Sequence, residues 1–143
     1  TPADKAIDTS ITPTLSWQCS DVDGDTLMYD TYFGTHPSLS IPVKQDQTNA
    51  TYNPGVLNYS TTYYWKIVAK DGKEGTKEGD VWSFTTIAKP NTPPLSPVNI
   101  NPANGAKDVK TTSTLSWTCN DPDGDVLVYD VYFGTSATPT LKQ

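Results

Sequence analysis

The sequence predicts an all-β protein: an antiparallel β-sandwich of about seven strands, followed by a partial second copy. Apolar and polar residues alternate in short runs separated by turn residues, the pattern of half-buried strands in a sandwich. No segment shows sustained helical periodicity. In addition, residues 2–35 recur at 102–135 with 21 of 34 positions identical. A repeat this long multiplies a whole domain rather than a short solenoid unit.

The repeat divides the 143-residue chain into three parts. Residues 1–87 are predicted to form a complete domain, residues 88–101 a linker, and residues 102–143 strands A to C of a second domain. The linker and Pro102 together hold five prolines, which favours a semi-rigid polyproline II spacer. Three strands alone leave apolar side chains and strand edges uncovered. We therefore expect either a continuation of the second unit or strand complementation by another chain, which would build dimers or filaments.

The strands of the first copy are predicted from the alternation, and the breaks between them from turn residues. The residues expected to face inward are Leu15, Trp17 and Cys19; Leu27, Tyr29, Thr31 and Phe33; Tyr63, Trp65, Ile67 and Ala69; and Trp82 and Phe84. The turn signals are Asp23-Gly24, Asn53-Pro54-Gly55, Asp71-Gly72 and Glu78-Gly79.

Each copy carries one cysteine, Cys19 or Cys119, so no disulfide can form within a unit. Cys19 falls on the face of Leu15 and Trp17. We therefore predict a buried cysteine that packs as a small apolar residue, with a reactive or intermolecular thiol as the alternative.

Residues 57–69 resemble the fibronectin type III family, where a Leu, a Thr and a Tyr at this spacing precede the alternating apolar residues of strand F. The resemblance implies that Tyr63 is the tyrosine corner, with its hydroxyl bonded to the backbone near Leu57. It also implies that Trp17 is the strand B tryptophan and that residues 82–85 form the closing strand. The fold itself implies no activity.

Composition excludes several partners and functions. The net charge is −6 and all ten basic residues are Lys, so nucleic acid is not an expected partner. No apolar run reaches the ~18 residues of a membrane span, and we expect no signal peptide within the given residues. The single histidine, His36, is replaced by Ser136 in the second copy. Without a catalytic motif, we expect no enzymatic activity.

Two aspartate-rich loops are the candidate metal sites. Alternate carboxylates around a glycine can direct oxygens at calcium, which takes six to eight such ligands. The EF-hand interpretation fails, because the twelfth position from the first aspartate is Tyr32. A site at the pole shared with the loop between strands F and G remains a prediction, and a cation there would stiffen the junction between units. A simple turn with carboxylates capping amides is the alternative. The candidate ligands are Asp21, Asp23, Asp25, Asp71 and Glu74 in the first unit, and Asp121, Asp123 and Asp125 in the second.

Two further features concern carbohydrate. Asn49 and Asn58 fit the N-glycosylation sequon. Exposed tyrosines can stack on sugar rings, although tyrosine is also a common strand residue. The tyrosines in question are Tyr32, Tyr52, Tyr59 and Tyr64.

These observations predict a non-catalytic structural or adhesive repeat module, extracellular or at a cell surface, that acts as a spacer or filament-forming subunit. Its expected partners are other copies of itself or neighbouring repeats. The alternative is a carbohydrate- or protein-binding accessory module of a secreted multidomain enzyme.

Overall fold

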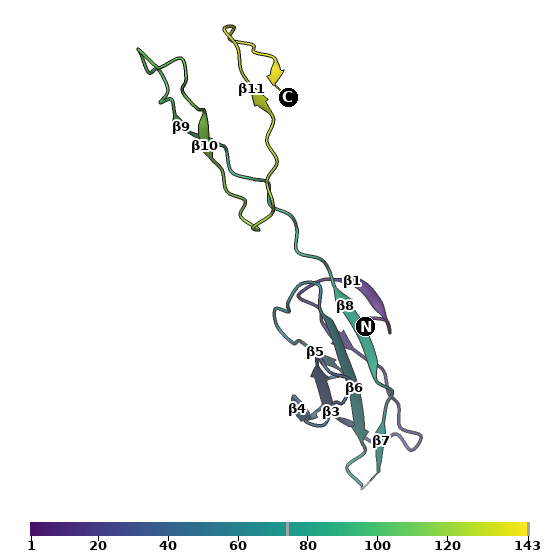
Figure 1. Ribbon diagram of the computed structural model, residues 1–143. Helices are drawn as coiled ribbons and strands as arrows, with labels where there is room; N and C mark the ends of the chain where they lie inside the picture. Colours follow the sequence, from purple (N-terminus) through teal and green to yellow (C-terminus); the bar gives the residue numbers. More distant parts are fainter. Residues whose placement is uncertain (74, 143) are drawn as a thin grey trace. The chain divides into compact units, whose positions relative to one another are not determined.

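The computed structural model describes residues 1–73 and 75–142, and within them every regular element is a β-strand. The chain divides into two compact units, residues 1–89 and 90–143. The strands β1 to β8 belong to the first unit and β9 to β12 to the second (Figure 1). The all-β prediction is confirmed.

The first unit has a larger and a smaller sheet. The larger sheet has the strand order β1-β8-β6-β3-β4, and β7 also pairs with β6. Its strands are β1 (Ala6–Thr9), β3 (Met28–Gly34), β4 (Lys44–Gln47), β6 (Thr62–Lys70), β7 (Thr76–Glu78) and β8 (Trp82–Thr86). The smaller sheet pairs β2 (Leu15–Ser16) with β5 (Thr51–Tyr52).

One strand pair contradicts the purely antiparallel prediction. β1 runs parallel to β8, with Ala6 opposite Phe84 and Thr9 opposite Thr86. The cause is the path of the N-terminal segment. Thr1 hydrogen-bonds to Ser16 beside the smaller sheet, and the chain then crosses to the larger sheet and runs in the direction of its last strand.

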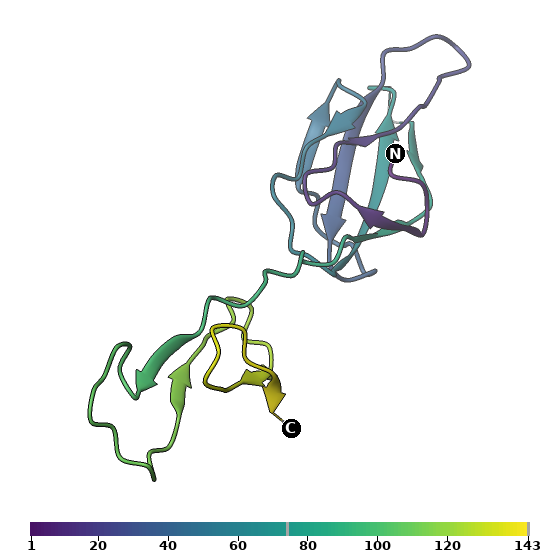
Figure 2. The same cartoon turned by 90° about the horizontal axis from the view of Figure 1, so that it is seen from above.

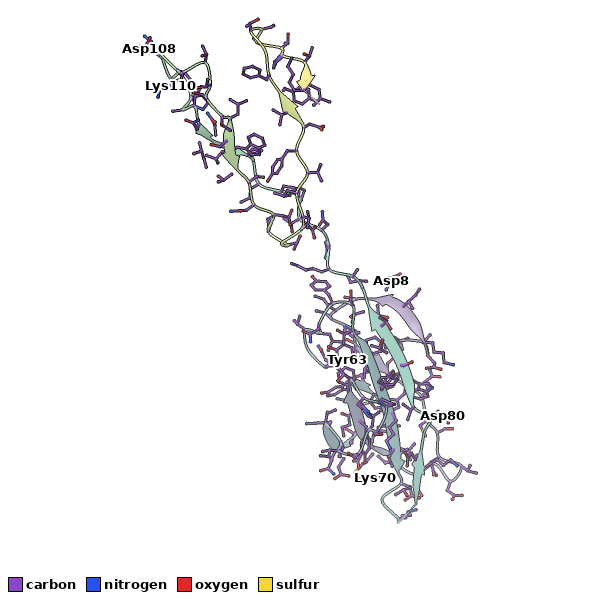
Figure 3. All side chains as sticks on the ribbon, viewed as in Figure 1. Asp8, Tyr63, Lys70, Asp80, Asp108 and Lys110 are labelled. Carbon is purple, nitrogen blue, oxygen red and sulfur yellow. The ribbon has the colours of Figure 1, made fainter. Side chains whose placement is uncertain are left out.

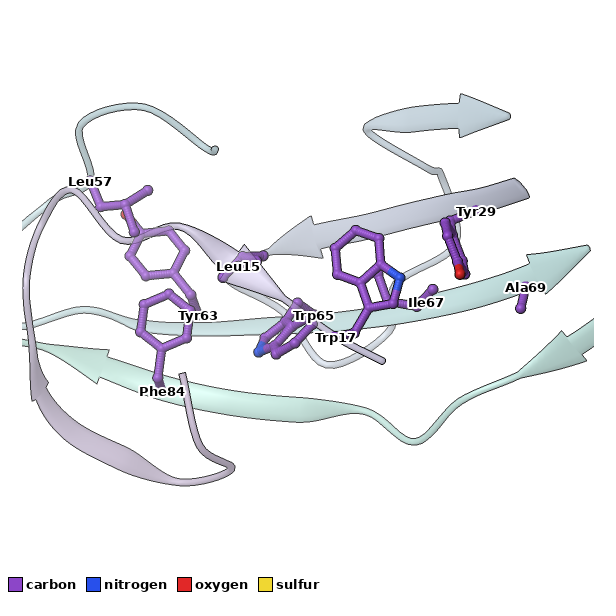
Figure 4. Packing of buried hydrophobic residues seen from close by; sticks show 9 residues of the cluster. All are labelled: Leu15, Trp17, Tyr29, Leu57, Tyr63, Trp65, Ile67, Ala69 and Phe84. Carbon is purple, nitrogen blue, oxygen red and sulfur yellow. The ribbon is translucent and has the colours of Figure 1, made fainter. Parts of the chain in front are cut away.

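The core of the first unit is a single cluster between the two sheets. β6 alternates buried and half-buried residues along its length, and Trp65 and Phe84 are 2% and 1% exposed. The rings of Phe33 and Tyr63 stack with centroids 5.1 Å apart. The buried residues are Leu15, Trp17, Tyr29, Leu57, Tyr63, Trp65, Ile67, Ala69 and Phe84 (Figure 4).

The cysteine prediction is wrong. Cys19 is exposed and Cys119 is half-buried, and both are free thiols. β2 ends at Ser16, so beyond Trp17 no strand of the smaller sheet holds the chain against the core. The alternation in the sequence therefore continues further than the strand does.

The second unit contains two separate two-stranded sheets (Figure 2). β9 (Val98–Asn101) pairs with β10 (Ser116–Thr118), and β11 (Val131–Tyr132) with β12 (Leu141–Lys142). β9 lies inside the predicted 88–101 linker, so the linker prediction extends too far. The last residues of the predicted linker hydrogen-bond their backbone N–H and C=O groups to β10 instead of forming a polyproline II spacer.

The tryptophan–tyrosine pair of the first unit recurs in the second unit, where the described residues form no buried cluster around it. Trp117 and Tyr129 meet edge to face at 5.5 Å, the same centroid distance as Trp17 and Tyr29. Tyr129 nevertheless remains 42% exposed, and Phe133 56%. The second unit therefore reproduces local packing but leaves its apolar face open.

Tyr63 makes the contact that the resemblance implies. Its hydroxyl oxygen accepts a hydrogen bond from the backbone N–H of Asn58 at 3.1 Å. We expect Tyr63→Phe to lower the free energy of unfolding of the first unit by about 1–2 kcal/mol, because this amide loses its acceptor. Denaturant unfolding measures the change. Tyr52→Phe is the control and should have little effect; equal losses in both variants would contradict a role for the hydroxyl.

Candidate functional site

The two loops predicted to share a pole of the first unit do lie together. Lys73 in the loop after β6 places its Nζ 2.7 Å from Oδ1 of Asp25. A hollow of about 270 Å³ is lined by both Asp21 and Asp71. The loops are therefore joined by an ion pair at the position where the sequence predicts a cation.

The aspartates that begin these loops act as caps of their own turns. Oδ1 of Asp21 accepts the N–H groups of Asp23 at 2.8 Å and of Asp25 at 3.2 Å. Oδ1 of Asp71 accepts those of Lys73 at 2.7 Å and of Gly75 at 3.0 Å. These bonds are the ones the turn alternative predicts.

The second copy repeats this turn and adds a contact to the incoming chain. Oδ1 of Asp121 accepts the N–H groups of Asp123 at 2.8 Å and of Asp125 at 3.3 Å. Oδ2 of Asp123 accepts the N–H of Thr92 at 2.6 Å. The segment that precedes β9 therefore reaches this loop, and a hydrogen bond holds it there.

The contacts around these carboxylates are those of capped turns. Among residues 1–73 and 75–142, no group of three or more potential ligands is placed to hold a metal ion. Oδ1 of Asp21 and Oδ1 of Asp71 accept amide N–H groups, and Oδ1 of Asp25 lies beside Nζ of Lys73. Calcium binding remains the alternative prediction, which the following experiment tests. Glu74, the remaining predicted ligand, lies outside the described residues.

We expect millimolar calcium to leave the melting temperature unchanged, because binding would have to break the turn hydrogen bonds and the ion pair to Lys73. Thermal unfolding with calcium or with a chelator measures this. A calcium-dependent rise that Asp21→Asn abolishes would contradict the turn interpretation and support the metal site.

A buried carboxylate that the sequence analysis missed lies on β3. Asp30 is 5% exposed; its Oδ2 lies 2.7 Å from Nζ of Lys70, and its Oδ1 accepts the N–H of Asp46 at 3.0 Å. Lys70, near the end of β6 (Figure 3), also contacts Asp46 at 2.9 Å. The sequence did contain a sign of this carboxylate, an acidic residue between two positions predicted to face inward. Its pairing with Lys70, however, depends on the register of β3 against β6.

The pKa values of this pair follow from these contacts. Burial acts to raise the pKa of Asp30, but the hydrogen bonds from Lys70 and Asp46, with the charge of Lys70, hold it below the ordinary value. The hydrogen bonds to Asp30 and Asp46 raise the pKa of Lys70. Both groups are kept in their charged forms, so the cluster is an ion pair that joins β3, β4 and β6.

The predicted carbohydrate features separate in the structure. Asn49 and Asn58 lie on exposed loops, which is compatible with glycosylation. The ring of Tyr52 packs against Phe33 at 6.2 Å, and Lys66 lies over Tyr32 at 4.7 Å. Of the four tyrosines considered, Tyr59 is exposed, at 38%, and Tyr64 is half-buried. The four therefore do not form one exposed row.

His36 lies in an exposed turn, where its Nδ1 accepts the N–H of Ser38 at 3.1 Å. His36 therefore belongs to a surface turn before Pro37.

Comparison of the chain with protein-family models, with curated proteins and with solved structures finds no match. Within the described part of the chain, no helix has the length and apolar character needed to span a bilayer.

Proposed function

We propose that this protein is a non-catalytic structural or adhesive repeat module of the fibronectin type III kind, extracellular or at a cell surface, that serves as a spacer or filament subunit. One observation carries the proposal: the first 34 residues of the domain, residues 2–35, recur at 102–135 with 21 identical positions. Repetition of this kind multiplies length and surface along a chain. The capped turns and ion pairs described above are consistent with this role, because they stabilise loops.

A spacer must resist extension, and single-molecule force spectroscopy of a polyprotein made from the full chain tests this. We expect one unfolding peak per copy, with a contour increment of roughly 300 Å for the 89 residues of the first unit. Trp17→Ala is the control that removes the peak. Extension without peaks in the unsubstituted chain would contradict a mechanical role.

The proposed location has its own test. An antibody against the first unit should label intact, unpermeabilised cells of the source organism, and brief protease treatment of those cells should remove the signal. Labelling that requires permeabilisation would contradict a surface location.

A further inference from the structure

The segment that leads into β9 is held to the second unit before that strand begins. Oδ2 of Asp123 accepts the N–H of Thr92 at 2.6 Å. Further along the chain, Leu95 donates its N–H to the carbonyl of Asn120 at 2.9 Å. Residues 92–97, which we call the strap, are therefore attached to the loop that follows β10.

Hydrogen bonds rather than apolar burial hold the strap. All of its residues are exposed, and Leu95 is 58% exposed. A third contact runs from the Sγ–H of Cys119, a weak donor, to the carbonyl of Leu95 at 2.9 Å. The bond from Thr92 to Asp123 is the strongest of the three, because its acceptor is a carboxylate. We therefore expect the order of the strap to depend on Asp123.

The conformation of the strap is restricted before it is attached. It contains Pro93, Pro94 and Pro97, and the ring of each proline fixes φ. A segment with few accessible conformations loses little entropy when it becomes ordered. A small number of hydrogen bonds can therefore hold it in place.

The turn that presents Asp123 does not need the strap. Oδ1 of Asp121 caps this turn, and Gly124 has a φ of 80°. The loop of the first copy has the same cap, from Oδ1 of Asp21, and Gly24 also has a φ of 80°. Only the second loop carries a strap within the described residues, so the same turn forms without one. The carboxylate of Asp123 is therefore positioned in advance.

The strap shortens the connection, by which we mean the chain between the two units. At the end of the first unit, Ile87 donates its N–H to the carbonyl of Thr9 at 2.9 Å. The bond of Thr92 to Asp123 is the first attachment on the other side. Residues 88–91 therefore form the connection while the strap is attached. Release of the strap would add up to roughly 20 Å of extended chain.

We propose that Asp123 is a releasable clasp that sets the length of the connection. The connection is residues 88–91 when the strap is attached and residues 88–97 when it is released. A pull along the chain loads the bond between Thr92 and Asp123 before it loads any strand of the second unit, so the connection lengthens first. The use of this clasp to set the reach of a spacer rests on the proposed function, whereas the clasp itself does not.

Backbone ¹⁵N relaxation of the full chain tests the clasp, because it reports the picosecond-to-nanosecond order of each amide. We expect order parameters of about 0.8 at Thr92 and Leu95 in the parent chain, and values below about 0.6 in Asp123→Ala. Flexible amides at both residues of the parent chain would overturn the proposal. Amides that stay rigid in Asp123→Ala would also overturn it.

The first copy supplies a matched control. Asp23 occupies the equivalent position in the same turn, and Asp23→Ala should leave the order of the strap unchanged. A loss of strap order in Asp23→Ala equal to that in Asp123→Ala would contradict a specific clasp.

A second variant removes the donor instead of the acceptor. Thr92→Pro lacks the N–H that Asp123 accepts, and it lies in the exposed strap, so it replaces Asp123→Ala if the resonances of Trp117 show that Asp123→Ala disturbs the second unit. We expect the order parameter of Leu95 to fall below about 0.6 in Thr92→Pro. A rigid Leu95 in this variant would overturn the proposal.

Small-angle X-ray scattering of the same chains tests whether the clasp sets the length of the connection. The maximum dimension of Asp123→Ala should exceed that of the parent by up to roughly 20 Å, and Asp23→Ala should match the parent. Equal dimensions in the parent and in Asp123→Ala would overturn the proposal. Force spectroscopy of the polyprotein is a separate test: if it shows no unfolding peaks while these results hold, the proposed function fails and the clasp stands.

Discussion

Trp17→Ala is expected to remove most of the stability of the first unit, by about 3–5 kcal/mol, the usual cost of truncating a buried aromatic residue. Trp17 is 9% exposed, and its ring meets those of Tyr29 at 5.5 Å and Trp65 at 6.4 Å. The truncation leaves a cavity between the two sheets that these rings cannot fill. Denaturant unfolding followed by circular dichroism measures the loss.

The repeat supplies a matched control for this substitution. Trp117 occupies the equivalent position and keeps the contact to Tyr129, but among the described residues the buried cluster contains none from the second unit. Trp117→Ala should therefore leave the main unfolding transition nearly unchanged. Equal losses in the two variants would contradict a single core in the first unit.

Asp30→Asn is expected to lower the free energy of unfolding by about 1–2 kcal/mol at neutral pH, because it removes a buried charged hydrogen bond whose partner is partly solvated. Lys70 keeps its contact to Asp46 at 2.9 Å, so the substitution does not leave that ammonium without a carboxylate. Asp130→Asn is the control: the equivalent residue in the second copy is exposed, and its substitution should have little effect.

The difference in free energy of unfolding between the parent chain and Asp30→Asn should depend on pH in a defined direction. The pKa of Asp30 is lowered from 3.8 in the folded state, so its contribution is present above 3.8 and lost as the pH falls through the folded pKa. The pKa of Lys70 is raised from 10.5, so its contribution is present below 10.5 and lost at higher pH. The difference between the parent chain and Asp30→Asn should be constant between these limits and shrink outside them. A difference that grows in acid would contradict the ion pair.

Much of the first unit could be predicted from the sequence, because apolar and polar residues alternate strictly along the strands that pack between the two sheets. Tyr63, Trp65, Ile67 and Ala69 face inward on β6 as the period of two requires. The same reasoning failed for Cys19. Burial at that position requires a neighbouring strand, and the alternation of residues within one segment gives no information about which strands lie beside it.

The pairing of distant segments could not be predicted from local pattern. The parallel contact of β1 with β8 follows from the path of the chain between two sheets. The ion pair between Asp30 and Lys70 depends on register. In the aspartate loops, residue types suggested both a metal site and a capped turn. The hydrogen bonds of the capped turn are present, and calcium binding stays a prediction.

Hydrogen–deuterium exchange of the full chain tests most directly whether the protein has one core, located in its first repeat. We predict the slowest exchange in β3, β6 and β8, which surround the buried aromatic residues, and exchange at least about a hundredfold faster throughout β9 to β12, where few amides are covered. Comparable protection in the two units, or fast exchange in β6, would contradict the account.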